Sequence, residues 1–235
     1  MFAPVQPRLA DSLERKGVFY TKPWVVDLLL DLAGYREDFN LVDRLAVEPA
    51  AGEGAFIVRM AERLVRSCQN HRRPLSDCEK SLIAFELDKK SAAAAKEAVL
   101  LTLQKMQVPT KIAEDLASSW IRAGDYLFEA FGLPPADFVI GNPPYVRLED
   151  IPEEVAGIYR ASYPTMRGRA DMYVAFFEAA LRGLKEAGVC TFICADRWML
   201  NQYGAELRGL VTSGFAVEAI ILNPAVRALQ IAPSH

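Results

Sequence analysis

The chain has 235 residues, of which 51% are hydrophobic and 24% are charged, and its formal net charge is −3. This hydrophobic fraction can drive burial, which excludes a disordered chain, and the length fits one globular α/β domain with or without an appendage. No apolar run is long enough to span a membrane, and the first residues lack the pattern of a secretory signal. Four cysteines without a CxxC pair predict a reduced, cytoplasmic protein with no metal site, and two histidines nearly exclude His-based zinc sites and catalytic triads.

Short apolar runs alternate with helical patterns along most of the chain. The first helix should begin at Pro23 and end at Gly34, because proline suits the first turn and glycine the stop. This order predicts an α/β fold with a Rossmann-like, mostly parallel sheet and helices on both faces. Strands are expected at 42–47, 82–85, 137–140, 189–194 and 217–222, with one more ending at Ala123, and helices over 56–65, 89–106, 171–186 and 203–211.

A glycine-bearing turn, Glu48–Phe56, joins the first strand to a helix. Its glycines allow the backbone to approach a ligand closely, and Glu86 ends the next strand at the spacing of a ribose-binding acid. The GxGxxG pattern is incomplete, and Glu48 and Glu53 would repel a pyrophosphate. A cofactor with a ribose and a cationic centre fits better, and S-adenosylmethionine has both.

Two further features follow the next strand ends. Asp125 closes the third strand, where it could accept a hydrogen bond from an adenine amine or cap the following helix, and both interpretations stay open. The tetrapeptide that begins at Asn142, Asn-Pro-Pro-Tyr, follows the fourth strand. The Asn142 side-chain oxygen and the Pro143 carbonyl can accept the two N–H groups of an aromatic amine, and Tyr145 offers a face for stacking the base. The alternative is a tight Pro-Pro turn with a buried tyrosine.

Five segments in this order resemble N6-adenine DNA methyltransferases, especially the gamma-type enzymes of type II and type IIG restriction–modification systems: KGVFYTKPWVV, VEPAAGEGAF, IAFELD, AGDYLF and VIGNPPYVRLED. The resemblance implies the class I S-adenosylmethionine-dependent methyltransferase fold over residues 1–222, with an N-terminal cofactor-contacting segment at 17–34. It implies methyl transfer to a flipped adenine of double-stranded DNA. It places S-adenosylmethionine against Thr21, Glu48, Ala50, Gly52, Glu86, Asp125 and Asn142, and the adenine against Asn142, Pro143 and Tyr145.

Residues 146–170 are polar, aromatic and basic, and are expected to form an excursion near the target base. Arg160, Arg167 and Arg169, interleaved with two tyrosines, form either a phosphate-contacting strip or a solvated loop. Other side chains are expected to be structural. Met172, Phe176 and Phe177 are expected to be helix core, and Cys190 and Cys194 core residues on one strand face.

The end of the sequence departs from the family. Residues 223–235 are expected to form an irregular tail, so that the final strand of the sheet and a target-recognition domain are absent, through truncation or because a second polypeptide supplies them. This leaves two alternatives to an active DNA methyltransferase. One is a non-catalytic cofactor-binding remnant or one subunit of a split enzyme; the other is a release-factor glutamine methyltransferase, which also carries Asn-Pro-Pro-Tyr but lacks a segment like KGVFYTKPWVV.

Overall fold

The computed structural model describes residues 21–223 and 226–233, the last strand by its backbone alone. Residues 17–20, at the start of the expected cofactor-contacting segment, lie outside the described residues. Within the described part, no helix is long and apolar enough to cross a membrane.

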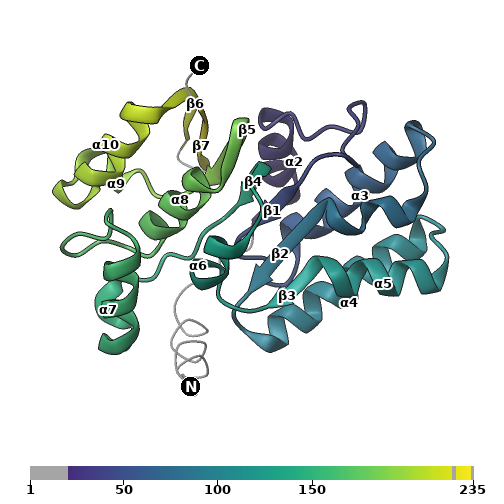
Figure 1. Cartoon of the computed structure of the whole chain (residues 1–235), viewed down its shortest axis with the longest axis horizontal. Helices are drawn as coiled ribbons and strands as arrows, with labels where there is room; N and C mark the ends of the chain where they lie inside the picture. The colour runs from purple at the N-terminus through teal and green to yellow at the C-terminus, as the bar shows by residue number, and fades with distance from the viewer. Residues whose placement is uncertain (1–20, 224–225, 234–235) are drawn as a thin grey trace.

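One seven-stranded sheet organises the chain, in the order β3-β2-β1-β4-β5-β7-β6 (Figure 1). Strands β1 to β5 are parallel, and β7 is antiparallel to both of its neighbours. The chain moves outward from β1 to β3 and then returns to β4 on the other side of β1, which makes a topological switch point between β1 and β4. In such sheets ligands bind beyond the carboxyl ends of the strands at the switch. The strands are β1 Ala46–Glu48, β2 Leu82–Glu86, β3 Ile121–Ala123, β4 Ala136–Gly141, β5 Leu184–Ile193, β6 Phe215–Asn223 and β7 Val226–Pro233.

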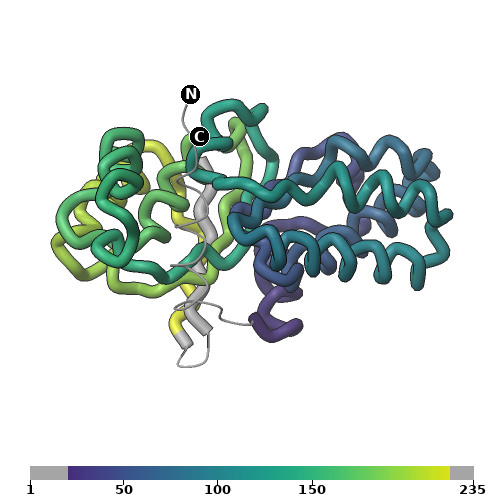
Figure 2. Tube along the Cα trace, turned by 90° about the horizontal axis from the view of Figure 1, so that it is seen from below, coloured from purple at the N-terminus to yellow at the C-terminus, as the bar shows by residue number. Residues whose placement is uncertain are grey.

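Helices cover both faces of the sheet. Alternate strand residues point to opposite faces, so Ala46 packs with α2–α5 while Val47 packs with α6–α8 and α10. Both views place α3–α5 at one end of the molecule and α7–α10 at the other (Figures 1 and 2). The helices are α2 Pro23–Leu32, α3 Ala55–Asn70, α4 Lys89–Lys105, α5 Thr110–Trp120, α6 Tyr126–Glu129, α7 Glu153–Ser162, α8 Tyr173–Arg182, α9 Arg197–Leu200 and α10 Ala205–Gly214. Short 3-10 turns occupy Leu75–Lys80, Ala130–Gly132, Leu148–Asp150 and Gln202–Gly204.

The predicted fold class is confirmed, with its elements close to their expected places. Helix α2 begins at Pro23, and Gly34, just beyond its end, has a φ of 72° that suits glycine. Four helices lie outside the expected ranges: α5, α7 within the excursion, and the short helices α6 and α9. The strand expected to start at Val42 starts only at Ala46, because Val42 packs in the core from a turn rather than from the sheet.

The expected absence of the final strand is wrong, and so is the irregular tail at 223–235. Strand β7 lies between β5 and β6, where Gln230 pairs with Thr191 on one side and with Ala219 on the other. The apolar residues Val226, Ala228, Leu229 and Ile231 do not alternate regularly, so the sequence shows no strand period. Backbone pairing on both edges defines this strand instead. A second polypeptide is therefore not needed to complete the sheet.

Candidate functional site

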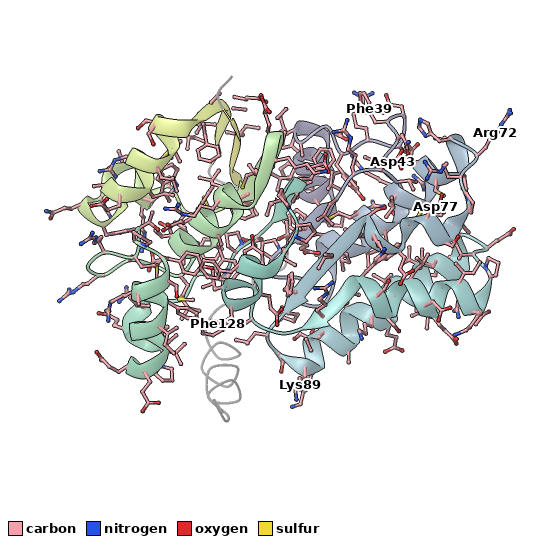
Figure 3. The ribbon with its side chains drawn as sticks, in the orientation of Figure 1. Phe39, Asp43, Arg72, Asp77, Lys89 and Phe128 are labelled. Carbon is pink, nitrogen blue, oxygen red and sulfur yellow. The ribbon has the colours of Figure 1, made fainter. Side chains whose placement is uncertain are left out.

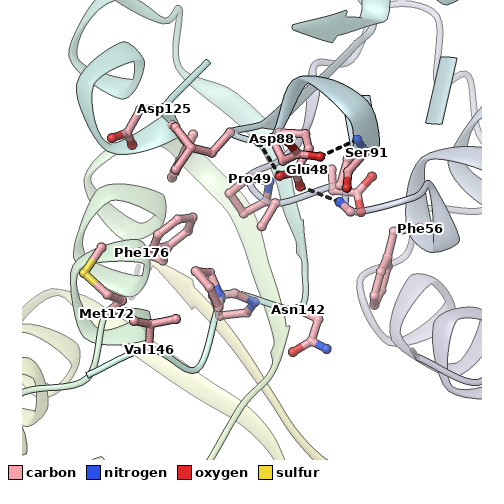
Figure 4. A pocket seen from close by; sticks show the side chains of 18 of the residues that line it. Glu48, Pro49, Phe56, Asp88, Ser91, Asp125, Asn142, Val146, Met172 and Phe176 are labelled. Atoms are coloured by element: carbon pink, nitrogen blue, oxygen red, sulfur yellow. Dashed lines mark hydrogen bonds between the residues drawn. The ribbon is translucent and has the colours of Figure 1, made fainter. Parts of the chain in front are cut away.

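Four neighbouring parallel strands end at one pocket. Glu48 is the last residue of β1, Glu86 is the last of β2, Asp125 follows β3, and Asn142 follows β4 directly. All four line a cavity of about 190 Å³ at the switch point of the sheet (Figure 4). The expected cofactor residues are thus brought together: Thr21, Glu48, Ala50, Gly52, Glu86, Asp125 and Asn142 line this pocket, as do Pro143 and Tyr145.

The glycine-bearing turn is tied to β2. The backbone N–H of Gly52 donates to Glu86 Oε2 at 2.7 Å, and the N–H of Asp88 donates to Glu86 Oε1 at 2.9 Å. Gly54, with a φ of 105°, lets the turn approach α4, because a Cβ there would lie 3.3 Å from the Cα of Ala95. Burial raises the pKa of Glu86, and the two backbone donors oppose that rise.

Glu48 is fully buried, and neither of its carboxyl oxygens makes a hydrogen bond of good geometry with a described residue, although the backbone N–H of Ile57 is close enough to oppose the rise in its pKa. Burial, reinforced by the nearby charge of Glu86, raises its pKa well above the usual range. A buried polar group without a partner is costly. The pocket therefore contains two acceptor atoms that a cationic or hydrogen-bonding ligand could satisfy.

Asp125 caps the following helix, which is one of its two expected roles, and it also lines the pocket. Its Oδ1 accepts from the N–H of Leu127 at 2.9 Å, which caps α6, and its Oδ2 accepts from the hydroxyl of Tyr159. The side chain also lines the pocket, so the capping does not remove it from a ligand's reach. Burial raises the pKa of Asp125, while the Tyr159 hydroxyl opposes the rise by stabilising the carboxylate.

Asn142 lies across the pocket from Asp88 and Asp125 (Figure 4). Its Nδ2 donates to Thr21 Oγ1 at 3.2 Å, and its Oδ1 is buried with no partner among the described residues. In this arrangement Thr21 engages the amide nitrogen, and the amide oxygen is left for a ligand. An amide oxygen that is buried and free is well suited to accept an N–H from a ligand.

Tyr145 stands beside Asn142 with its ring held in place. Its hydroxyl donates to the carbonyl of Ile193 at 3.1 Å, and its ring lies 6.1 Å from that of Tyr173. Burial raises the pKa of Tyr145, so it remains a neutral phenol at physiological pH. The ring is half-buried and lines the pocket, which leaves part of it available to a planar ligand.

Sequence reasoning missed several residues of the pocket wall. Leu87 and Asp88 follow Glu86 directly, and Ser91 donates its N–H to Asp88 Oδ2 at 2.7 Å, so these could have been found from the spacing alone. Met172 and Phe176 pack in the core as expected, but they also line the pocket, whereas Phe177 is core only. Tyr159 reaches the pocket from α7, and no sequence signal pointed there.

The structure does not place the three arginines of the expected phosphate-contacting strip in one cavity. Arg160, Arg167 and Arg169 are all exposed. Arg169 lines a second cavity beside the first, whereas Arg160 and Arg167 line neither of these two cavities. The interleaved Tyr159 and Tyr163 are buried rather than displayed next to the arginines. The four cysteines are buried free thiols, which confirms Cys190 and Cys194 as core residues.

Comparisons with known proteins identify the chain's relatives. The family model of the Eco57I restriction-modification methylase matches residues 80–223. The type II methyltransferase M.PaeR7I of Pseudomonas aeruginosa is 38% identical over 213 residues, covering 89% of this chain and 37% of its own length. M.XhoI of Xanthomonas vasicola is 37% identical over 209 residues, covering 87% of this chain and 38% of its own. The chain thus spans little more than a third of these relatives.

Solved structures agree on the fold. A protein of Listeria monocytogenes described as a class I S-adenosylmethionine-dependent methyltransferase aligns over 100% of this chain and 63% of its own, with a TM-score of 0.59 at 14% identity. The fold class and the cofactor type expected from the sequence agree with this likeness. Because the family model matches more than half of the residues, the chain belongs to the Eco57I restriction-modification methylase family and has the fold of class I S-adenosylmethionine-dependent methyltransferases.

Proposed function

We propose that this chain transfers a methyl group from S-adenosylmethionine to the N6 amine of a flipped adenine in double-stranded DNA, as part of a restriction–modification system. The observation that supports this most strongly is the state of Asn142. Its amide nitrogen is engaged by Thr21, and its amide oxygen is buried beside Tyr145 with no described partner.

The pocket residues fit the cofactor. Glu86, with both oxygens fixed by backbone donors, retains lone pairs for ribose hydroxyls, and Asp125 retains one for the adenine amine. Leu87 and Phe176 offer apolar walls for the adenine ring. Glu48 supplies carboxyl oxygens for the cationic part. When bound, the cofactor supplies the methyl group that the reaction transfers.

The target amine is a poor nucleophile because its lone pair is delocalised into the ring. Asn142 Oδ1 and the Pro143 carbonyl accept its two N–H groups and favour a tetrahedral, nucleophilic nitrogen. With the cofactor bound, the nitrogen would bond to the methyl carbon as the bond between that carbon and the sulfonium sulfur breaks. The sulfur would keep the electron pair as a neutral thioether, and the nitrogen would lose one proton to solvent. Asn142 accepts at any working pH, so this step requires no tuned base, and Tyr145 stacks against the base to offset the cost of flipping.

Mass spectrometry of the methylated base tests this proposal. Duplex DNA of mixed sequence is incubated with the chain and cofactor, digested to nucleosides and analysed. We expect N6-methyladenine, and we expect Asn142→Ala to abolish it while leaving cofactor affinity within about 3-fold, since the lost bonds go to the base. N4-methylcytosine as the product, or normal turnover by the variant, would contradict the assignment.

A further inference from the structure

A second cavity, of about 260 Å³, adjoins the first and has a different character. Its walls are mainly polar and include three guanidinium groups. The cavity is lined by Arg147, Leu148, Glu149, Arg169, Asp171, Arg197, Asn201 and Tyr203. Three segments distant in sequence therefore direct one arginine each toward the same space.

The wall between the two cavities is a short antiparallel pairing. Arg147 and Asp171 form an isolated bridge, and the N–H of Met172 donates to the carbonyl of Val146 at 2.8 Å. Val146 and Met172 line the first pocket, whereas Arg147 and Asp171 line the second. The two cavities therefore lie on either side of this pairing. Arg147, in the second cavity, directly follows Val146, which lines the first pocket next to Tyr145.

A chain of tyrosines also joins the two cavities. The ring of Tyr145 contacts that of Tyr173, whose hydroxyl shares a hydrogen bond of 2.8 Å with Tyr203. Tyr203 in turn donates to Asp171 Oδ2 at 3.5 Å. This fixes the position of the second cavity relative to the stacking ring.

The second cavity has an excess of positive charge that an anion could balance. Arg147 pairs with Glu149 at 3.4 Å, and both of these side chains are largely exposed, so the pair is weak. Among the described residues Arg169 makes no ion pair, and Arg197 makes none within ion-pair distance, although its charge and that of Arg147 act on Asp171 and oppose the rise in its pKa. Asp171 partly balances the positive charge, but three guanidiniums outnumber the two acids that line the cavity.

We propose that this cavity binds a backbone phosphate of DNA next to the target nucleotide, with Arg147, Arg169 and Arg197 as its ligands. The inference rests on the proposed function, since a flipped base at Tyr145 would carry its own phosphates to this side of the wall. Guanidinium groups bind phosphate oxygens in a fixed, often bidentate geometry. Arg160 and Arg167, which line neither cavity, are not part of this site.

Salt-dependent DNA binding tests the site. The chain carrying Arg147→Gln, Arg169→Gln and Arg197→Gln together is compared with wild type by fluorescence anisotropy on a short duplex. A control chain carries Arg36→Gln, Arg66→Gln and Lys111→Gln, which remove the same charge from exposed positions outside both cavities. A third chain carries lysine at the three cavity positions. Circular dichroism and calorimetric titration with S-adenosylmethionine show whether each chain is folded.

The glutamine chain should bind DNA about 10-fold more weakly at low salt, with a slope of log K against log salt shallower by about 1–2. The control should match wild type, and the lysine chain should recover most of the slope. Equal slopes in the glutamine chain and wild type would overturn the proposal without touching the proposed function. A wild type that binds cofactor but no DNA would overturn both the phosphate site and the proposed function. Inorganic phosphate that binds the cavity while DNA affinity is unchanged in the glutamine chain would assign the site to a free anion, which also overturns it. Loss of DNA affinity without any methyl transfer would support the phosphate site and contradict only the reaction.

Discussion

Burial of the Glu48 carboxyl group destabilises the folded chain. This carboxyl group is inaccessible to solvent, makes no hydrogen bond of good geometry with a described residue and lies near a second carboxyl group, Glu86. A glutamine of the same size would cost less, because it carries no charge to desolvate. A cationic ligand group would reverse this balance by stabilising the carboxylate. The cost is therefore consistent with a residue kept for binding rather than for stability.

Glu48→Gln should separate stability from binding. The folded-state pKa of Glu48 is raised, so its contribution to wild-type stability is greatest below the unfolded value of about 4.3 and is lost as pH rises toward the folded value. The variant should therefore exceed wild type in unfolding free energy by about 1–3 kcal/mol at pH 8, but not at pH 4. Its affinity for S-adenosylmethionine should fall.

Urea denaturation at both pH values, with Glu79→Gln as an exposed control, measures the effect. A gap of the same size at pH 4 and pH 8 would show that the Glu48 carboxyl is not held neutral.

Helix α7 connects the excursion to the cofactor end of the pocket. Tyr159, in the helix, and Tyr163, just after its end, are both buried. They pack on rings from the segment after β3, Tyr159 on Phe128 at 5.4 Å and Tyr163 on Phe131 at 5.4 Å. Phe128 lies on the side of α6 that is nearer α7 in Figure 3. The hydroxyl of Tyr159 donates to Asp125, whereas that of Tyr163 donates to the backbone carbonyl of Leu127. The position of α7 thus sets the environment of Asp125.

Tyr159→Phe and Tyr163→Phe form a matched pair of variants. Each removes one buried hydroxyl from the same segment of the chain, but only Tyr159→Phe takes a donor from the Asp125 carboxylate. We expect Tyr159→Phe to weaken S-adenosylmethionine binding by about 3–10-fold, with a larger loss at pH 6 than at pH 8, because the pKa of Asp125 rises further without that donor. Tyr163→Phe should show no such pH dependence in calorimetric titrations, and equal behaviour of the two variants would refute the coupling.

The site residues at the strand ends could be predicted because the sequence patterns that mark them are local. Glu86 follows a short apolar run, and the turn before α3 contains glycines at Gly52 and Gly54, so the site residues could be placed before their distances were known. Tyr159 could not be placed, since its contact with Asp125 depends on how a long excursion folds back over 34 residues. Sequence pattern does not report such tertiary contacts.

Strand β7 was not predicted because its pairing depends on parts of the chain that are distant in sequence. It is defined by two neighbours: β5, which precedes it by more than thirty residues, and β6, with which it pairs from Asn223 and Val226 outward. The alternation of β6 is itself broken by a register shift between Val217 and Ala219. Sheet completion is therefore a long-range property, which local patterns represent poorly.

Gln230→Pro should test the central position of β7. Gln230 is paired on both sides, and proline removes the N–H that one of those ladders requires. We expect a loss of about 3 kcal/mol or more in unfolding free energy, against less than about 1 kcal/mol for Gln230→Ala, which keeps the N–H. Chemical denaturation of the two variants checks this, and a proline variant as stable as the alanine one would place the strand outside the sheet.

We expect the four strand ends to form one S-adenosylmethionine site. Calorimetric titration of the cofactor into the wild-type chain, shown to be folded by circular dichroism, tests it most directly. We expect saturable binding at one site, weakened by about 1–3 kcal/mol in Glu86→Ala and unchanged in the exposed control Glu79→Ala. A folded wild-type chain that gives no binding heat, or a Glu86→Ala variant that binds as tightly as wild type, would show that the strand ends do not form this site.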